Sequence, residues 1–163
     1  MRELDPKQLK ENVFSLLDDR WTLVTAGTPE RCNTMTASWG GLGVLWNKPV
    51  ATIYVRPQRY TYEFLEGGDR FSLSFLGEEW REQLNYCGRV SGRDEDKFAG
   101  SGLSPASEDG TPYIREAELV LLCRKLYWND LDPDHMGETA LKHYRNRDYH
   151  RMYVGEITKV LVK

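Results

Sequence analysis

Strand-like patterning dominates the chain. Apolar and β-branched residues alternate or cluster in segments bounded by Gly, Pro, Asn or Asp, and these segments predict β-strands. The predicted strands cover 21–28, 49–57, 70–77, 117–130 and 150–163. The 117–130 segment is a long strand with a near-continuous apolar run, which is typical of burial on both faces.

Helical spacing occupies the connections between these strands. Residues 5–19 predict an opening helix, with Asp5 as its N-cap, Pro6 in the first turn and apolar residues on one stripe. Shorter helices are predicted at 59–68, 78–90 and 93–103. Many strands with short helices between them favour a mainly β fold, an antiparallel barrel with peripheral helices, because closure removes exposed strand edges. We expect one domain over 1–163, with residues 1–19 packing outside the barrel.

The stretch RCNTMTASWGGLGVLW, residues 31–46, departs from this patterning. It stands where the next strand is expected, with a bend at its glycines, yet its centre at 33–38 is small and rich in hydroxyl groups. Small side chains leave backbone amides uncovered, and Gly40 and Gly41 allow another group to approach closely. The pattern indicates the close approach of another group without identifying that group.

Composition places the chain among globular proteins. Hydrophobic residues make up 40% of it and charged residues 29%. No apolar run reaches the roughly 18 residues that span a bilayer, and the N-terminal residues lack an apolar signal-peptide core. The formal net charge is −3 with acids and bases interspersed, which disfavours non-specific nucleic-acid binding. We therefore expect a cytoplasmic protein that binds neither nucleic acid nor a membrane.

Cysteine and histidine spacing gives little reason to expect a metal site or a reactive thiol. Cys32, Cys87 and Cys123 are far apart and are interpreted as reduced core residues; a reactive thiol at Cys87 is the alternative. No C-x-x-C pair exists, and the three histidines do not share a helical or strand face, so no metal is predicted. No nucleophile–base motif is found either.

The order of four segments resembles a known family. These segments are NTMTASWGG at 33–41, YVRPQRYTYEF at 54–64, CGRVSGRDEDKFAGSGL at 87–103 and DYHRMYVGEI at 148–157. Together they resemble the flavin reductase-like FMN-binding split-barrel proteins, and in particular the flavoredoxin-like branch. The similarity extends over nearly the whole chain. It implies a split β-barrel homodimer, with one FMN per subunit near the subunit interface.

Two basic segments suit the phosphate and ribityl chain of FMN, where the resemblance also places them. Phosphate favours Arg, Lys, hydroxyl groups and free backbone amides, preferably where a helix begins. The candidates are Arg56, Gln58, Arg59 and Thr61 in the first segment, and Ser91, Gly92, Arg93 and Lys97 in the second. Arginines at strand ends are often simply solvated, and Arg59 or Arg93 has the alternative of pairing with Asp94 or Asp96. One phosphate site and no adenosine pocket favour FMN over FAD.

The small, hydroxyl-rich part of the stretch 31–46 is expected to line the flavin ring. The resemblance assigns this role to Met35, Thr36, Ala37, Ser38 and Trp39. Backbone N–H groups of small residues such as Ala37 and Ser38 suit the polar edge of the ring, where donors stabilise negative charge on the reduced flavin. Core packing of Met35 and Trp39 is the alternative.

His150 begins the last predicted strand, where the family often has a histidine near the flavin. It is the candidate contact to a ring edge or to a bound nicotinamide, with a surface or core histidine as the alternative. The polar segment 129–148 beside it is expected to form a loop or short helix over the flavin or at the dimer seam, and Trp128 is expected at the interface.

These residues predict an FMN-binding oxidoreductase, specifically an NAD(P)H-dependent flavin reductase that passes electrons to an acceptor. The alternative is a flavoredoxin-type electron-transfer protein without a nicotinamide reaction of its own, served by a redox partner protein. A third possibility is a barrel that binds another aromatic ligand. Gly40, Gly41 and Gly43 lack the third glycine of the G-x-G-x-x-G motif, so no separate dinucleotide domain is expected and NAD(P)H would dock directly over the flavin.

Overall fold

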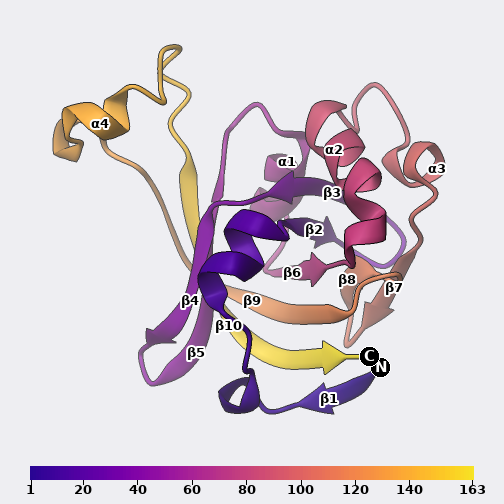
Figure 1. The fold of residues 1–163 in the computed structure, drawn as a ribbon. Coiled ribbons are helices and arrows are strands. Elements are labelled where there is room, and N and C mark those ends of the chain that lie inside the picture. The colour runs from indigo at the N-terminus through magenta and orange to yellow at the C-terminus, as the bar shows by residue number, and fades with distance from the viewer.

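The computed structural model describes all residues from Met1 to Lys163 (Figure 1). An antiparallel sheet of eight strands forms the body of the molecule. Its strands are β1 (Arg2–Leu4), β2 (Thr22–Gly27), β3 (Cys32–Ala37), β4 (Gly40–Leu45), β5 (Lys48–Val55), β6 (Arg70–Phe75), β9 (Leu119–Asp130) and β10 (Arg151–Val162). A separate hairpin pairs β7 (Pro105–Glu108) with β8 (Thr111–Ile114).

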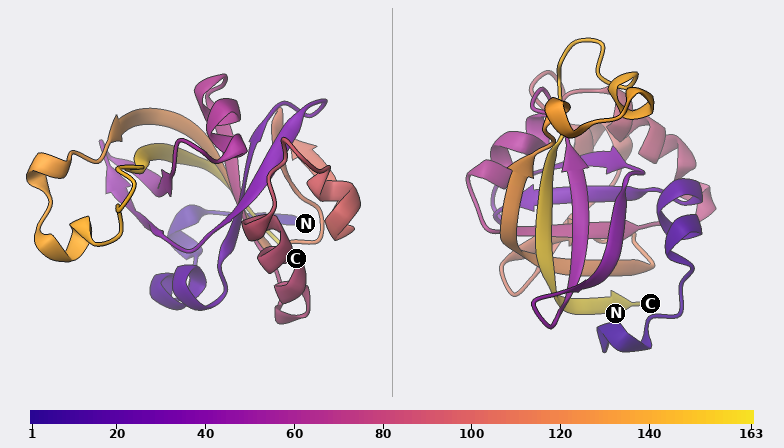
Figure 2. Two further views of the ribbon diagram at one scale, coloured as in Figure 1. Left: turned by 90° about the horizontal axis from the view of Figure 1, so that it is seen from above. Right: turned by 90° about the vertical axis from the view of Figure 1, so that its left-hand side faces the viewer.

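The sheet order is β3-β2-β6-β9-β10-β5-β4, with β1 added beside β10. In the right-hand view of Figure 2, β4 and β5 run nearly perpendicular to β2, β3 and β6 behind them, and β9 and β10 take part in both layers. No pairing joins β3 to β4, so the barrel is open between these two edge strands. The predicted split antiparallel barrel with short peripheral helices is confirmed.

The two longest strands bend where they pass from one layer to the other. The β9–β10 register shifts between Val154 and Gly155 and again between Ile157 and Lys159. A Cβ atom on Gly155 would lie 2.5 Å from the Phe71 ring, so only glycine allows β10 to pass this closely over the core. Bulges of this kind increase strand curvature and let one sheet wrap around a single core.

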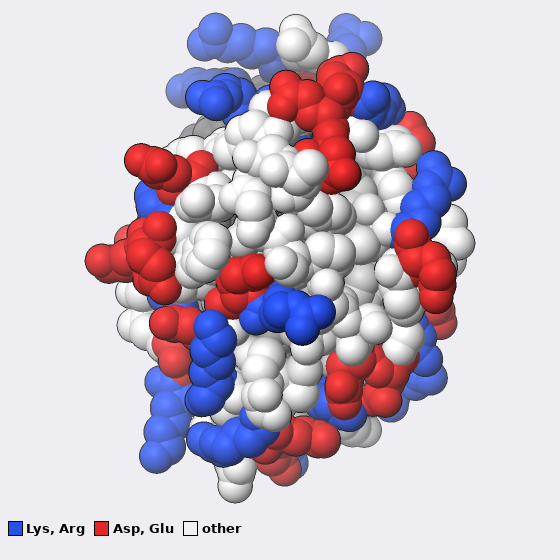
Figure 3. Space-filling view, turned by 90° about the vertical axis from the view of Figure 1, so that its right-hand side faces the viewer, with Lys and Arg blue, Asp and Glu red and all other residues white.

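Short helices cover one side of the barrel: α1 (Tyr60–Glu66), η3 (Glu78–Trp80), α2 (Arg81–Arg89) and α3 (Lys97–Ser101). They lie inside the segments predicted to be helical. Leu84 and Cys87 of α2 pack into a cluster with Leu23 of β2, which is separate from the main barrel core. Cys87 and Cys123 are buried and all cysteines are free, so the expected core role holds, while Cys32 is only partly buried. Figure 3 shows that basic and acidic side chains interleave on the face that carries α2 and α3.

The prediction of a single helix over 5–19 is wrong. Asp5 does cap a turn, accepting a hydrogen bond from the Lys7 amide at 2.8 Å, but this 3-10 helix η1 ends at Gln8 (Pro6–Gln8). Asn12 then caps a second turn through the Phe14 amide, and that turn continues as a π-helical segment, η2 (Ser15–Asp19). A second cap residue inside the periodic segment therefore divides it, and strand β1 before it was not predicted.

The stretch 31–46 contains two strands and not one bent strand. The break falls at Ser38 and Trp39, just before the glycines, and these two residues join the two edges of the open barrel. A Cβ atom on Gly40 would lie 2.7 Å from the Thr52 carbonyl oxygen, so the group that approaches this glycine is the β5 backbone. The close approach inferred from the sequence is real, but at Gly40 it is between strands.

Strand β9 is buried only in its first half. Leu119 to Cys123 are buried, whereas most residues from Arg124 to Asp130 are exposed, so the inference of burial on both faces applies to five residues only. Beyond β9, the segment 131–150 projects from the barrel and carries η4 (Pro133–His135) and α4 (Glu138–Leu141), as Figures 1 and 2 show. None of the helices combines the length and apolarity that crossing a bilayer would require.

Candidate functional site

A cavity of about 280 Å³ opens beside the link between β3 and β4, at the split of the barrel. Its lining residues are Met35, Thr36, Ala37, Ser38, Trp39, Tyr54, Arg56, Arg59 and His150. The structure thus brings the whole predicted ring segment together with two of the predicted basic residues and the predicted histidine. Tyr54 of β5 was not predicted. Arg56 follows the end of β5 two residues later, so in extended backbone both side chains point to the same side.

The ring segment presents mainly backbone to this cavity. Met35 is 5% exposed and belongs to the barrel core, so the core alternative holds for its side chain. The Thr36 hydroxyl donates to the Leu84 carbonyl at 2.5 Å and is therefore occupied by α2. Trp39 is 44% exposed, which excludes the core alternative for this residue.

Strand β3 is a sheet edge, so alternate main-chain groups have no strand partner. Lys97 donates to the Thr34 carbonyl at 2.8 Å from the side opposite β2. Since main-chain groups alternate in direction along a strand, the N–H of Thr36 also points away from β2, while that of Ala37 points toward it. Free donors are therefore expected at Thr36 and beyond the strand end at Ser38.

His150 lies behind Trp39 and is neutral near pH 7. Its ring centroid is 5.2 Å from that of Trp39, and its Nδ1 is 2.8 Å from the Tyr144 hydroxyl. Burial, together with the Arg56 charge, lowers the pKa of His150 to about 4. Burial raises the pKa of Tyr144, so its hydroxyl stays protonated and is available to donate to Nδ1. With Tyr144 as the donor, the proton of the neutral imidazole resides on Nε2.

Arg56 and Gln58 hold the projecting segment against the barrel. Arg56 forms a salt bridge with Asp148 at 2.5 Å and donates to the His143 carbonyl at 3.1 Å, and its guanidinium is 5.1 Å from the Tyr144 ring centroid. Gln58 donates to the same Asp148 carboxylate at 2.9 Å. The hydrogen bonds from Gln58 and Arg56 lower the pKa of Asp148. The charge of Arg56 is thus already balanced, by a residue that the sequence analysis did not single out.

The second basic segment packs against the start of α1. Arg93 pairs with Glu63 and donates to the Gln58 carbonyl at 3.0 Å, so the expected partners Asp94 and Asp96 are not the ones it uses. The Ser91 hydroxyl accepts from the Arg93 amide at 3.2 Å. Arg93 therefore holds the 91–97 segment against α1, so the two segments predicted to bind phosphate lie side by side.

Asn33 connects these segments to β3. Its side-chain amide donates to the buried Thr61 hydroxyl at 2.8 Å. A Cβ atom on Gly92 would lie 2.1 Å from Asn33 Oδ1, so no other residue fits there without displacing this side chain. Asn33 was quoted within the predicted motif but was not named as a site residue. The small, polar character of residues 33–38 is the sequence signal that could have pointed to Asn33 as a site residue.

Arg59 and Lys97 are cations without a carboxylate partner. Arg59 donates to the Gly88 carbonyl at 2.8 Å and to the Cys87 carbonyl at 3.3 Å. Lys97, which is 3% exposed, donates to the same Cys87 carbonyl at 2.8 Å as well as to Thr34. Two positive charges therefore lie within hydrogen-bonding distance of one oxygen atom, and neither has a negative charge beside it.

Burial of Arg59 and Lys97 without an acidic partner has an electrostatic cost, which lowers the pKa of both side chains. Burial lowers the pKa of Arg59, and burial with the Arg59 charge lowers the pKa of Lys97 to about 8. Buried cations are normally paired with an acid, because removing a charge from water without compensation is costly. Arg59 lines the cavity and Lys97 is buried beside it, so the uncompensated positive charge of this pair lies at one end of the cavity and favours an anionic ligand there.

Comparison with known proteins gives a consistent result. Residues 15–163 match the family model described as "Flavin reductase like domain". The chain is 27% identical over 98% of its length to a high molecular weight rubredoxin from Moorella thermoacetica, and it spans 60% of that relative's length.

Solved structures of similar fold include a flavoredoxin, an FMN-binding protein and an NADH:FAD oxidoreductase. A flavoredoxin from Methanosarcina acetivorans has a TM-score of 0.69 and 26% identity, over 98% of this chain and 76% of that one. An FMN-binding protein from Thermus thermophilus has a TM-score of 0.69 at 21% identity, over 100% and 82%. An NADH:FAD oxidoreductase from Streptomyces globisporus has a TM-score of 0.66 at 19% identity, over 88% and 74%. The last two similarities establish the fold alone.

Proposed function

Because this chain belongs to the flavin reductase-like domain family, we propose that it binds FMN and acts as a flavin-dependent oxidoreductase. The observation that carries this proposal is the cavity at the split of the barrel, which residues 36–39 line together with Arg59. Lys97 lies beside Arg59, donates to the same Cys87 carbonyl, and likewise has no acidic partner. Bound FMN would supply two-electron chemistry at its ring, while the protein orients that ring and tunes its potential.

The residues present fit the charge of FMN. A phosphate dianion would compensate Arg59 and Lys97, and charge-assisted hydrogen bonds to phosphate are among the stronger ones in proteins. Gly92, Asn33 and Lys97 line a neighbouring cavity, and the buried Thr61 hydroxyl accepts a hydrogen bond from Asn33. One such anion site supports FMN over FAD, in agreement with the FMN-binding protein of similar fold.

On the ring side, the N–H groups of Thr36 and Ser38 and the Nε2–H of His150 are the proposed donors to the polar edge of the flavin. Donors there favour negative charge on the reduced ring. Trp39 flanks the ring and Met35 supports it from the core. His150 is assigned a contact role, and its neutral state at pH 7 makes it a hydrogen-bond donor without adding charge.

Arg56, Gln58 and Arg93 are proposed to position the site and not to carry the phosphate charge. Each already holds a carboxylate or a carbonyl group of a neighbouring segment. Arg56 keeps His150 and Tyr144 beside the cavity by anchoring Asp148, and Arg93 keeps the 91–97 segment beside α1. Substitution of these residues is expected to disturb the positions of the site residues more than the charge available to the phosphate.

NAD(P)H is the proposed electron donor, as in the flavin reductase activity for which the family is described. The second candidate is an electron carrier that exchanges electrons with an iron–sulfur protein, which the high molecular weight rubredoxin relative favours. The purified protein should show flavin absorbance near about 450 nm and release FMN on denaturation. Bleaching by NADH or NADPH supports the reductase, and bleaching by a reduced ferredoxin or rubredoxin alone supports the carrier. A colourless protein that takes up no FMN would contradict both and favour a barrel for another aromatic ligand.

We also propose that two copies of the chain associate through the exposed apolar end of the β4–β5 hairpin. Val44, Leu45 and Trp46 there are 77%, 36% and 59% exposed, and Tyr127 and Trp128 of β9 are also exposed. Trp46 has a positive φ of 50°, which is unfavourable for a bulky residue and places its indole at the hairpin tip. Light scattering should give a dimer for the native chain and a monomer for Trp46→Lys, whereas a monomeric native chain would contradict the proposal.

A further inference from the structure

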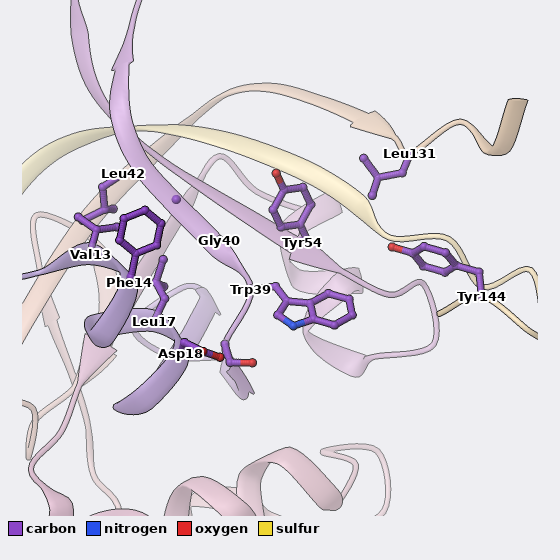
Figure 4. A pocket seen from close by; sticks show the side chains of 12 residues that line it. Val13, Phe14, Leu17, Asp18, Trp39, Gly40, Leu42, Tyr54, Leu131 and Tyr144 are labelled. Atoms are coloured by element: carbon purple, nitrogen blue, oxygen red, sulfur yellow. The ribbon is translucent and has the colours of Figure 1, made fainter. Parts of the chain in front are cut away.

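A second, larger cavity opens on the other side of Trp39. Its volume is about 860 Å³, and it shares Ser38, Trp39 and Tyr54 with the cavity proposed to hold the flavin. Its remaining lining residues are Val13, Phe14, Leu17, Asp18, Gly40, Gly41, Leu42, Leu131 and Tyr144. Figure 4 shows Phe14, Val13 and Leu42 at one end, Trp39 and Tyr54 in the middle, and Leu131 and Tyr144 at the other end.

Aromatic side chains dominate the walls of this cavity. Phe14, Trp39, Tyr54 and Tyr144 come from four different parts of the chain and surround one space. Phe14 is 85% exposed, although its neighbours Leu16 and Leu17 are 1% and 6% exposed. A phenyl group that is left in water at the rim of an apolar cavity gains by contact with an apolar ligand, and flat rings are the ligands that aromatic walls stack with best.

The charge of this cavity differs in sign from that of its neighbour. Asp18 is the only lining residue with a formal charge, and no Lys, Arg or His contributes to the wall. The smaller cavity has Arg56, Arg59 and the neutral His150, and no acid. An anionic ligand would therefore be repelled by Asp18 and would find no cation to compensate it.

We infer that this cavity binds a flat, uncharged ring compound of the quinone class that accepts electrons from the reduced flavin. The inference rests on the proposed function, since the shared wall of Ser38, Trp39 and Tyr54 places such a ligand next to the flavin cavity. Two electrons and two protons pass from the reduced flavin to the quinone, and the products are oxidised flavin and a hydroquinone.

Binding of two naphthoquinones that differ in charge tests this inference directly. Menadione is uncharged, and 1,2-naphthoquinone-4-sulfonate carries a negative charge. Isothermal titration of each into the FMN-loaded chain should show menadione binding at least about tenfold more tightly, because Asp18 repels the sulfonate. Equal affinities for the two compounds, or no binding of menadione, would overturn the inference.

Charge reversal at Asp18 has a matched control in the adjacent acid. Both Asp18 and Asp19 are exposed residues of η2, but only Asp18 lines the cavity. Asp18→Lys should raise the affinity for the sulfonate about tenfold, whereas Asp19→Lys should leave it near the native value. Phe14→Ala should weaken menadione binding about two- to tenfold without loss of folding, because the side chain is exposed. Identical behaviour of the two lysine variants, or an unchanged menadione affinity in Phe14→Ala, would contradict the assignment.

The same titrations on FMN-free protein separate this inference from the proposed function. If the chain takes up no FMN yet still binds menadione with the Asp18 and Phe14 dependence, the cavity is assigned correctly and the flavin proposal is wrong. If FMN binds and menadione does not, the flavin proposal stands and the acceptor site is wrong.

Discussion

The two cavities on either side of Trp39 share three residues and have opposite chemistry. One is small, is bordered by Arg56 and Arg59 with Lys97 nearby, and offers backbone donors of an edge strand. The other is three times larger, is lined by aromatic and aliphatic side chains, and has a single acid. The difference shows that a two-residue link between strand edges can separate a polar cavity from an apolar one.

The contrast follows from which elements cover each edge of the split barrel. Strand β3 faces the beginning of α1 and the beginning of α3, which bring Arg59 and Lys97. Strand β4 faces the π-helical turn η2, which brings Leu17 and Phe14. The charge of Arg56, which follows β5, is balanced by Asp148, so the peripheral segments supply the remaining charge and polarity of each cavity.

Removal of the Arg59 charge should have the largest effect on this contrast. In Arg59→Met, FMN affinity should fall about ten- to a hundredfold, because a charge-assisted hydrogen bond contributes about 1.5–3 kcal/mol. Fluorescence titration of FMN measures the change. Arg89→Met removes the same charge from an exposed position on α2 and should leave the affinity near the native value. Equal losses in both variants would indicate a general charge effect and not a site.

Lys97 should make FMN binding dependent on pH. The pKa of Lys97 is lowered to about 8, and a phosphate dianion favours its protonated form. Affinity should therefore be full below about pH 8 and fall by up to about tenfold as the pH rises toward 10. The same lowered pKa acts on folding in the opposite direction, because the unfolded chain binds more protons between pH 8 and 10.5, so stability from this group rises with pH.

Lys97→Met is the variant that tests this pH dependence. Its FMN affinity should be lower at pH 7 and nearly constant between pH 7 and 9.5, as measured by titration at each pH. An unchanged pH profile in the variant would show that another group controls binding. Circular dichroism melting at each pH confirms that the variant is folded while the titration is made.

The smallest effect is expected from the hydrogen bond between Tyr144 and His150. Tyr144→Phe removes the donor to Nδ1, so the imidazole is no longer held with its proton on Nε2. A net hydrogen bond contributes about 1 kcal/mol, which corresponds to about 20 mV in a two-electron potential, and the flavin midpoint should become more negative by about that amount. Tyr149→Phe, whose ring is 5.1 Å from that of Tyr144, is the control and should not move the potential.

Most of the fold follows from patterns that local physics determines. The strands at 21–28, 49–57 and 70–77 are short, periodic and bounded by turn residues, and the structure places strands there. The opening helix was misread because Asn12, a cap residue inside a periodic segment, was overlooked. The exposed second half of β9 was misread because burial there depends on how far the strand extends beyond the barrel, which no local pattern records.

The sequence predicted which residues lie at the candidate site better than it predicted what each of them does there. The family resemblance carried by the order of motifs predicted Met35, Trp39 and His150 at one site, and the structure places all three around one cavity. Sequence could not show that Arg56 is paired with Asp148, because Arg56 follows β5 whereas Asp148 lies 92 residues later, in the projecting segment that only the tertiary structure brings back to the barrel. It could not reveal the apolar cavity either, since Phe14 and Tyr144 are far apart along the chain.

Comparison of FMN with riboflavin tests the central claim most directly, because the two ligands differ only in the phosphate. Residues 35–39 are proposed to contact the ring, and Arg59 and Lys97 are proposed to bind the phosphate. Titration of the native chain should give an FMN affinity at least about tenfold above that for riboflavin, and the ratio should approach one in the Arg59→Met, Lys97→Met double variant while riboflavin affinity stays nearly unchanged. A native ratio near one, or a ratio that the double variant leaves intact, would contradict the account.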